Sequence, residues 1–164
     1  MNWTARALGL GLIALLAGCA LMPERVPLGA TRSEIEQRLG SPTGVYALAD
    51  GTRLQYSRQP AGQQVYNLDL DAGGRLRQTE QVMESAWLER IPLDQWTQQD
   101  ALLNLGRPAI VERVASFDGV LWTYRLREMS TPRFVHLYLD AAGLVRRVSF
   151  SDEPLPDDVF DMAR

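Results

Sequence analysis

Alternation of apolar and polar side chains marks several segments of this chain as β-strands. Residues 65–70 read Val-Tyr-Asn-Leu-Asp-Leu, and residues 134–139 read Phe-Val-His-Leu-Tyr-Leu. Successive side chains of a strand point to opposite faces of a sheet, so this pattern predicts strands with one buried face. The same reasoning predicts further strands at residues 52–57, 75–82, 120–127 and 144–150.

Two short helices of about two turns each are predicted at residues 31–39 and 97–105. Each segment begins with Thr, and an acidic residue follows three positions later, which is the spacing of a capping box. Each segment ends in Leu-Gly-x-Pro. Gly40 and Gly106 suit the left-handed conformation that ends a helix, and the proline that follows cannot continue it.

The same order of elements occurs twice: a helix, a strand, an Asp-Gly turn and three further strands. We therefore expect an α+β protein with two tandem units, residues 28–83 and 84–150, each with one or more short helices followed by an antiparallel β-meander. Residues 84–93 link the units and are expected to contain a helix that leads into the second. The acidic, proline-rich residues 151–164 are predicted to form a disordered tail.

Residues 1–18 have the features of a secretion signal. Arg6 and the amino terminus provide positive charge, and the apolar run at residues 7–17 has the length of a signal core, which is too short to span a bilayer. Leu16-Ala17-Gly18-Cys19 resembles the lipobox of bacterial lipoproteins. The alternative is an ordinary signal peptide or a membrane anchor in which the cysteine is incidental.

The lipobox resemblance implies that the chain is cleaved after Gly18 and that Cys19 carries a lipid. It also implies that the new amino group is acylated with a fatty acid such as palmitate. Two or more acyl chains would hold the protein stably on a membrane. Residue 20 is Ala, whereas Asp here resembles an inner-membrane retention signal, so we expect the periplasmic face of the outer membrane. Residues 19–27 would be the tether.

Composition excludes several classes of function. A net charge of −3 and a pI near 5.2 give no reason to expect nucleic acid as a partner. Cys19 is the only cysteine, so no disulfide can form within the chain. His136 is the only histidine, which excludes metal sites with two histidines, and no Gly-x-Ser-x-Gly motif is present. We therefore expect neither an enzyme nor a cofactor.

One segment partly matches a calcium-binding EF-hand loop. Asp69, Asp71, Gly74 and Glu80 occupy positions 1, 3, 6 and 12 of such a loop. The flanking residues have the pattern of strands, whereas an EF-hand has helices on both sides. A hairpin turn explains this segment and its counterpart in the second unit, so a turn is the favoured interpretation.

The chain resembles the SmpA/OmlA (BamE-like) family of lipoproteins. The motifs are Gly29-x-Thr31, Leu39-Gly40-x-Pro42, the aromatic second strands Leu54-x-Tyr56 and Trp122-x-Tyr124, and the Asp-x-x-Gly turn before each last strand. The doubled arrangement is similar to that of β-lactamase inhibitory proteins. The resemblance implies a protein-binding accessory or scaffold of outer-membrane protein assembly, with barrel-assembly subunits as possible partners. The alternatives are an inhibitor or ligand-binding module and a purely structural envelope lipoprotein.

Alternation also predicts a binding face on the second unit. If Val135, Leu137 and Leu139 point into the core, then Phe134, His136 and Tyr138 point outward. Arg125 and Arg127 share this outer face from the preceding strand. Aromatic and Arg side chains are enriched at interface hot spots, so we expect these five residues to contact a periplasmic or outer-membrane protein. The alternative is that a helix or the first unit covers this face.

Overall fold

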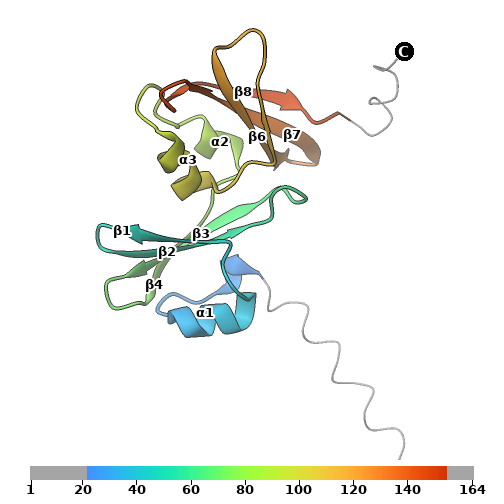
Figure 1. Cartoon of the computed structure of the whole chain (residues 1–164). Helices are drawn as coiled ribbons and strands as arrows, with labels where there is room; N and C mark the ends of the chain where they lie inside the picture. Colours follow the sequence, from blue (N-terminus) through green and yellow to red (C-terminus); the bar gives the residue numbers. More distant parts are fainter. Residues whose placement is uncertain (1–21, 155–164) are drawn as a thin grey trace, which may run out of the picture.

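The structure, a computed structural model, describes residues 22–154 and contains two four-stranded antiparallel sheets with a few short helices (Figure 1). It is therefore a mixed α and β fold, rich in β-structure. The signal sequence, Cys19 and residues 155–164 of the predicted tail lie outside the described residues. Between residues 22 and 154, the structure contains no helix with the length and apolar character that a membrane span needs.

The first sheet has the strand order β1-β2-β3-β4, with every neighbouring pair antiparallel. It follows a single helical turn and one short α-helix. The elements are the 3-10 helix η2 (Pro23–Arg25), α1 (Arg32–Leu39), β1 (Gly44–Leu48), β2 (Gly51–Ser57), β3 (Val65–Asp71) and β4 (Leu76–Gln81).

The second sheet has the order β5-β6-β7-β8 and follows two short helices. The first of these helices lies in the predicted linker. The elements are α2 (Ser85–Leu88), α3 (Gln98–Leu105), β5 (Ile110–Glu112), β6 (Gly119–Glu128), β7 (Thr131–Asp140) and β8 (Val145–Asp152). β8 runs two residues past the expected end at Phe150, because Ser151 and Asp152 pair with the beginning of the long strand β7.

The two predicted capping boxes are confirmed. The Thr31 amide donates to the Glu34 carboxylate at 2.7 Å, and the Thr97 amide donates to the Asp100 carboxylate at 2.8 Å. Aspartate thus replaces the more usual glutamate in the second box. Both helices end at a glycine in the left-handed region, with φ of 79° at Gly40 and 74° at Gly106.

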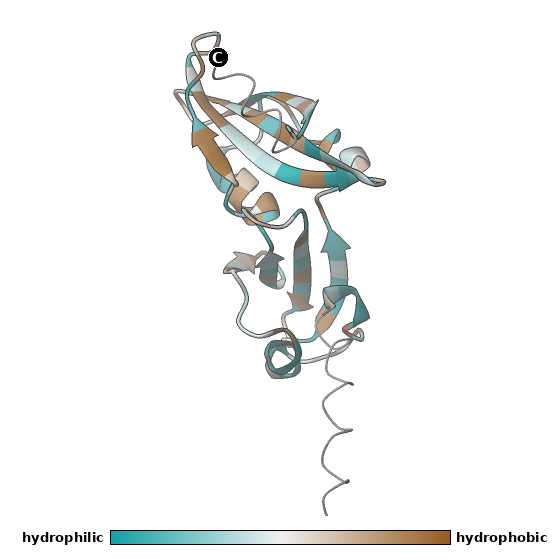
Figure 2. Cartoon of the chain, turned by 90° about the vertical axis from the view of Figure 1, so that its right-hand side faces the viewer, coloured by the Kyte–Doolittle hydropathy of each residue, from teal (hydrophilic) through white to brown (hydrophobic). Residues whose placement is uncertain are grey.

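The first hydrophobic core lies between α1 and one face of the first sheet. Ile35 is the fully buried residue of α1, which is otherwise almost wholly polar and is teal in Figure 2. It packs with Leu54, Leu68 and Leu70, and with other apolar side chains of the sheet. The predicted inward direction of Tyr66, Leu68 and Leu70 is confirmed, since all three are buried.

The second core lies between α2, α3 and the inner face of the second sheet. Leu88, Ala101 and Leu105 of the helices pack against the strands, whose buried side chains are Trp122, Tyr124, Leu126, Val135, Leu137 and Leu139. The exposed fractions of Val135, Leu137 and Leu139 are all 0%, so the predicted register of β7 is confirmed.

The other face of the first sheet is polar and meets α3, which lies between the two sheets (Figure 1). Arg53 and Asp69 pair across β2 and β3 at 2.7 and 2.9 Å, with side chains only 12% and 10% exposed. The same guanidinium donates to the Asn104 side chain at 2.8 Å. An ion pair inside the first half of the chain therefore also holds the second half.

Two amide side chains of the same polar face complete the C-terminal end of α3. Asn67 donates to the Asn104 carbonyl at 2.8 Å, and Gln55 donates to the Leu103 carbonyl at 3.2 Å. The last turn of a helix leaves its carbonyls without partners inside the helix. The polar side chains of the first sheet therefore provide the partners that the second-half helix lacks.

Candidate functional site

The predicted binding residues lie on one face of the second sheet, which we call the outer face. Antiparallel pairing puts Thr123 opposite His136 and Arg125 opposite Phe134. Directly paired residues of neighbouring strands point to the same side. The outer face is formed by Ile110 and Glu112 of β5, Leu121, Thr123, Arg125 and Arg127 of β6, Phe134, His136 and Tyr138 of β7, and Arg147, Ser149 and Ser151 of β8.

His136 lies at the centre of the outer face and is held by two hydroxyl groups. Its Nδ1 lies 2.8 Å from the Thr123 hydroxyl, and its Nε2 lies 2.9 Å from the Ser151 hydroxyl. Partial burial lowers the pKa of His136, and the nearby carboxylate of Glu112 acts in the opposite direction. A neutral imidazole fits this environment, since hydroxyls can accept from one ring nitrogen and donate to the other.

Phe134 and Tyr138 lie on either side of His136 on the same strand face, and they differ in the number of ring contacts that they make. The Phe134 ring makes an edge contact with the imidazole, with 6.0 Å between ring centroids. Tyr138 makes an edge contact with Phe117 at 5.3 Å, and the Arg147 guanidinium lies 3.6 Å from its ring centroid. Tyr138 is thus held between a loop residue and a cation, whereas the ring contact found for Phe134, which is partly buried, is that with His136.

Arg125 is used mainly to join the two halves of the chain. Its guanidinium donates to the carbonyls of Pro60 and Ala61 at 3.2 and 3.3 Å and pairs with the Glu153 carboxylate. The Gln59 side-chain amide also binds the Arg125 backbone, donating to its carbonyl at 2.6 Å and accepting from its amide at 3.1 Å. The β2–β3 loop therefore occupies the edge of β6 that the short strand β5 leaves free.

Arg127 contacts the same loop. Its Nε donates to the side-chain carbonyl of Gln63 at 2.8 Å. The prediction that both arginines share the outer face is confirmed by the strand register, whereas their contacts with the first half of the chain were not predicted. Nothing in the alternation pattern indicates Gln59 or Gln63, because these residues lie in a loop.

The residues of the calcium-like motif have other roles. Asp69 is paired with Arg53, and the Asp71 carboxylate accepts a hydrogen bond of 3.0 Å from the Arg75 amide in the β3–β4 turn. Within residues 22–154, no group of three or more metal-ligating side chains comes together. The described geometry of this segment is that of a hairpin turn.

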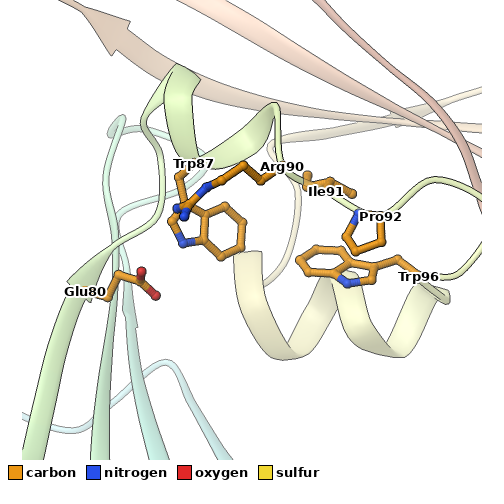
Figure 3. Close-up of a pocket in the computed structure, with 6 residues that line it drawn as sticks. All are labelled: Glu80, Trp87, Arg90, Ile91, Pro92 and Trp96. Carbon is orange, nitrogen blue, oxygen red and sulfur yellow. The ribbon is translucent and has the colours of Figure 1, made fainter.

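A pocket lies away from the outer face, between β4 and the segment that joins the two halves. Its volume is about 300 Å³, and its walls include two tryptophans (Figure 3). The alternation pattern does not indicate this pocket, since its residues come from the end of β4, the one-turn helix α2 and the irregular segment that follows it. The lining residues are Glu80, Trp87, Arg90, Ile91, Pro92 and Trp96.

Comparisons with known proteins give limited similarity. No family model matches the sequence, and no curated protein matches it. One similar solved structure is that of a DUF4309 family protein, YjgB, from Bacillus subtilis. The two share 14% sequence identity over 76% of this chain and 79% of that chain, with a TM-score of 0.33.

Proposed function

We propose that this chain is a lipid-anchored accessory or scaffold protein on the periplasmic face of the outer membrane, where it binds a protein of outer-membrane assembly. In this proposal the chain consists of two tandem units of the SmpA/OmlA (BamE-like) type. The lipobox at Cys19 provides the anchor. The outer face of the second sheet is the surface for the partner.

Equivalent contacts in the two halves support the tandem interpretation. The Tyr56 hydroxyl donates to the Gly40 carbonyl at 3.0 Å, and the Tyr124 hydroxyl donates to the Gly106 carbonyl at 2.9 Å. In each half, the tyrosine of the second strand thus binds the glycine that ends the helix. The last strand pair also has a register shift at the same relative place in both halves, at Asp69/Leu70 and at Tyr138/Leu139.

The main observation in favour of protein binding is that, in the part of the chain that the structure describes, helices cover or meet three of the four sheet faces but not the outer face of the second sheet. In the first sheet, α1 covers one face and α3 meets the other; in the second sheet, α2 and α3 cover the inner face. Within residues 22–154, no helix packs on the outer face of the second sheet. This face nevertheless exposes parts of Phe134, His136 and Tyr138, a composition typical of interface hot spots.

Site-specific crosslinking tests the proposal. A photo-crosslinking amino acid replaces Phe134 in the full chain, the cells are irradiated, and the products from solubilised envelopes are identified. We expect a defined adduct with a barrel-assembly subunit. Val45 is the matched control position, because it is an apolar strand residue that is 47% exposed on the first sheet.

The pattern of adducts decides between the candidate functions. An adduct with a soluble enzyme at Phe134 would favour the inhibitor alternative instead. Equal labelling at Phe134 and Val45, or no protein adduct at either position, would contradict a partner-binding role for the outer face. A purely structural envelope lipoprotein would give no protein adduct at either position.

A further inference from the structure

The pocket between β4 and the linker has an aromatic corner formed by Trp87 and Trp96 (Figure 3). The two ring centroids lie 5.9 Å apart and the ring planes are inclined at 60°. The rings therefore form two non-parallel apolar walls, and both side chains are only partly buried. Each indole also has one N–H donor for a polar group. Ile91 and Pro92 complete the apolar lining.

Two opposite charges line the same pocket. Glu80 comes from β4, where it lies opposite Asn67 on the polar face of the first sheet, and Arg90 comes from the linker. Neither side chain belongs to any of the ion pairs found within residues 22–154, although ion pairs are common elsewhere in this part of the chain. The pocket thus presents one anionic acceptor and one cationic donor, and its formal charge is zero.

The backbone arrangement at position 96 does not require a tryptophan. Trp96 and Ala30 have equivalent backbone roles, because their carbonyls accept 2.8 Å hydrogen bonds from Val145 and Leu76 at the start of the last strand of each sheet. Ala30 fills its position with a methyl group and is buried. The large side chain of Trp96 is thus not needed for this backbone hydrogen bond; it packs on the edge of the second core and forms one wall of the pocket.

We propose that this aromatic corner binds one pyranose ring of an uncharged saccharide. One face of a pyranose presents mainly C–H groups, which pack on an indole face, while its hydroxyls both donate and accept hydrogen bonds. Those hydroxyls match the Glu80 carboxylate and the Arg90 guanidinium. A singly charged ligand would be attracted by one of these groups and repelled by the other, whereas neutral hydroxyls can bind both. The volume of about 300 Å³ suits a single ring. This inference is independent of the proposed protein partner.

Tryptophan fluorescence of the purified full chain tests the inference. The probe is an uncharged tetrasaccharide of β-1,4-linked N-acetylglucosamine, with methyl β-glucopyranoside as a smaller probe. We expect a saturable change in emission. Trp96→Ala keeps the backbone hydrogen bond and removes a partly buried side chain at the edge of the second core, so the variant should fold with reduced stability. It should weaken binding by about tenfold or more, equivalent to about 1.4 kcal/mol. Glu80→Gln, which keeps the shape but removes the charge, should weaken binding less.

Several results would overturn the inference. One is the absence of any saturable change up to the solubility limit of both sugars. A second is equal affinity in the parent chain and in Trp96→Ala; if that variant fails to fold, Arg90→Ala provides the same test at an exposed side chain. A third is saturation by a proline-rich peptide with no response to either sugar, which would assign the corner to a polypeptide.

Discussion

The side-chain amide of Asn67 donates a 2.8 Å hydrogen bond to the backbone carbonyl of Asn104. By this contact, a residue in the middle of the first sheet completes the last turn of a helix that belongs to the core of the second. It explains why Asn67, which is 1% exposed, is polar although it is buried. A buried amide is tolerated when its hydrogen bonds are satisfied, and the end of a helix offers free acceptors.

We predict that Asp69→Asn strongly destabilises the protein. The change keeps the size of the side chain but leaves the guanidinium of Arg53, which is mostly buried, without its opposite charge. Breaking a buried pair on one side costs about 3–5 kcal/mol. Chemical denaturation measures the free energy of unfolding.

Asp50→Asn is the matched control for this prediction. Asp50 also pairs with an arginine, Arg77, but the two side chains are 66% and 39% exposed. Water screens such a pair, so we expect little change in stability. Equal losses in the two variants would show that the buried position of the Arg53–Asp69 pair has no special importance.

The two helix-ending glycines provide a second test. Both have positive φ with ψ near 180°, a region essentially confined to glycine, so alanine is strained at either place by about 1–3 kcal/mol. A Cβ at Gly40 would have no atom within 4 Å, whereas a Cβ at Gly106 would lie 2.6 Å from Oε1 of the buried Gln55. We therefore expect Gly106→Ala to lower the melting temperature clearly more than Gly40→Ala. The reverse order would contradict the close approach of the two halves at Gly106.

Tyrosine ionisation makes stability fall at high pH. Burial raises the pKa of Tyr56 to about 12 and raises the pKa of Tyr124 as well, from an ordinary value of 10.0. The unfolded chain therefore releases these protons at lower pH than the folded chain. Their contribution to stability is complete below pH 10 and is lost as the pH rises toward 12. The chain has no lysine, so few other side chains titrate in this range.

Phenolate absorbance during an alkaline titration measures this effect. Of the five tyrosines, at least Tyr56 and Tyr124 should ionise late, and Tyr56→Phe should remove one late group. Denaturation experiments at pH 8 and pH 11 should show lower stability at the higher pH. Ionisation of all five tyrosines near pH 10 in the folded protein would contradict the burial of these two hydroxyls.

Truncation of neighbouring side chains on β7 should change thermal stability by very different amounts. Phe134→Ala combined with Tyr138→Ala is expected to abolish capture of the partner and to change thermal stability little, because both side chains lie on the outer face. Leu137→Ala, at a fully buried position, is expected to cost about 2–5 kcal/mol. A large loss of stability in the double variant would mean that the two aromatic rings serve the fold, through contacts such as that between Tyr138 and Phe117.

The anchor is tested by Cys19→Ala. Without the thiol no thioether lipid can form, so the variant should be recovered uncleaved or in the soluble fraction, and it should not label with a fatty-acid probe. Fractionation of the envelope measures this directly. Complete retention of Cys19→Ala in the outer membrane would show that another feature holds the protein there.

Features encoded within a few residues could be predicted from the sequence. The capping boxes at Thr31 and Thr97 and the inward direction of Leu137 follow from spacing and alternation, and the structure confirms them. The role of Arg125 could not be predicted in this way. It depends on a loop some sixty residues earlier in the chain, and alternation shows only which face a side chain occupies. The pocket at Trp87 and Trp96 was missed for another reason: its residues are near one another in the chain but follow no regular helix or strand period.

The polar face of the first sheet has a consequence for the order of synthesis on the ribosome. The residues that later hold α3, among them Arg53, Gln55 and Asn67, are made before that helix exists. If this face were apolar, the emerging first half would present an adhesive surface to other nascent chains. Amides and an ion pair are instead well hydrated, so water can occupy their hydrogen-bonding groups until the helix arrives and replaces it.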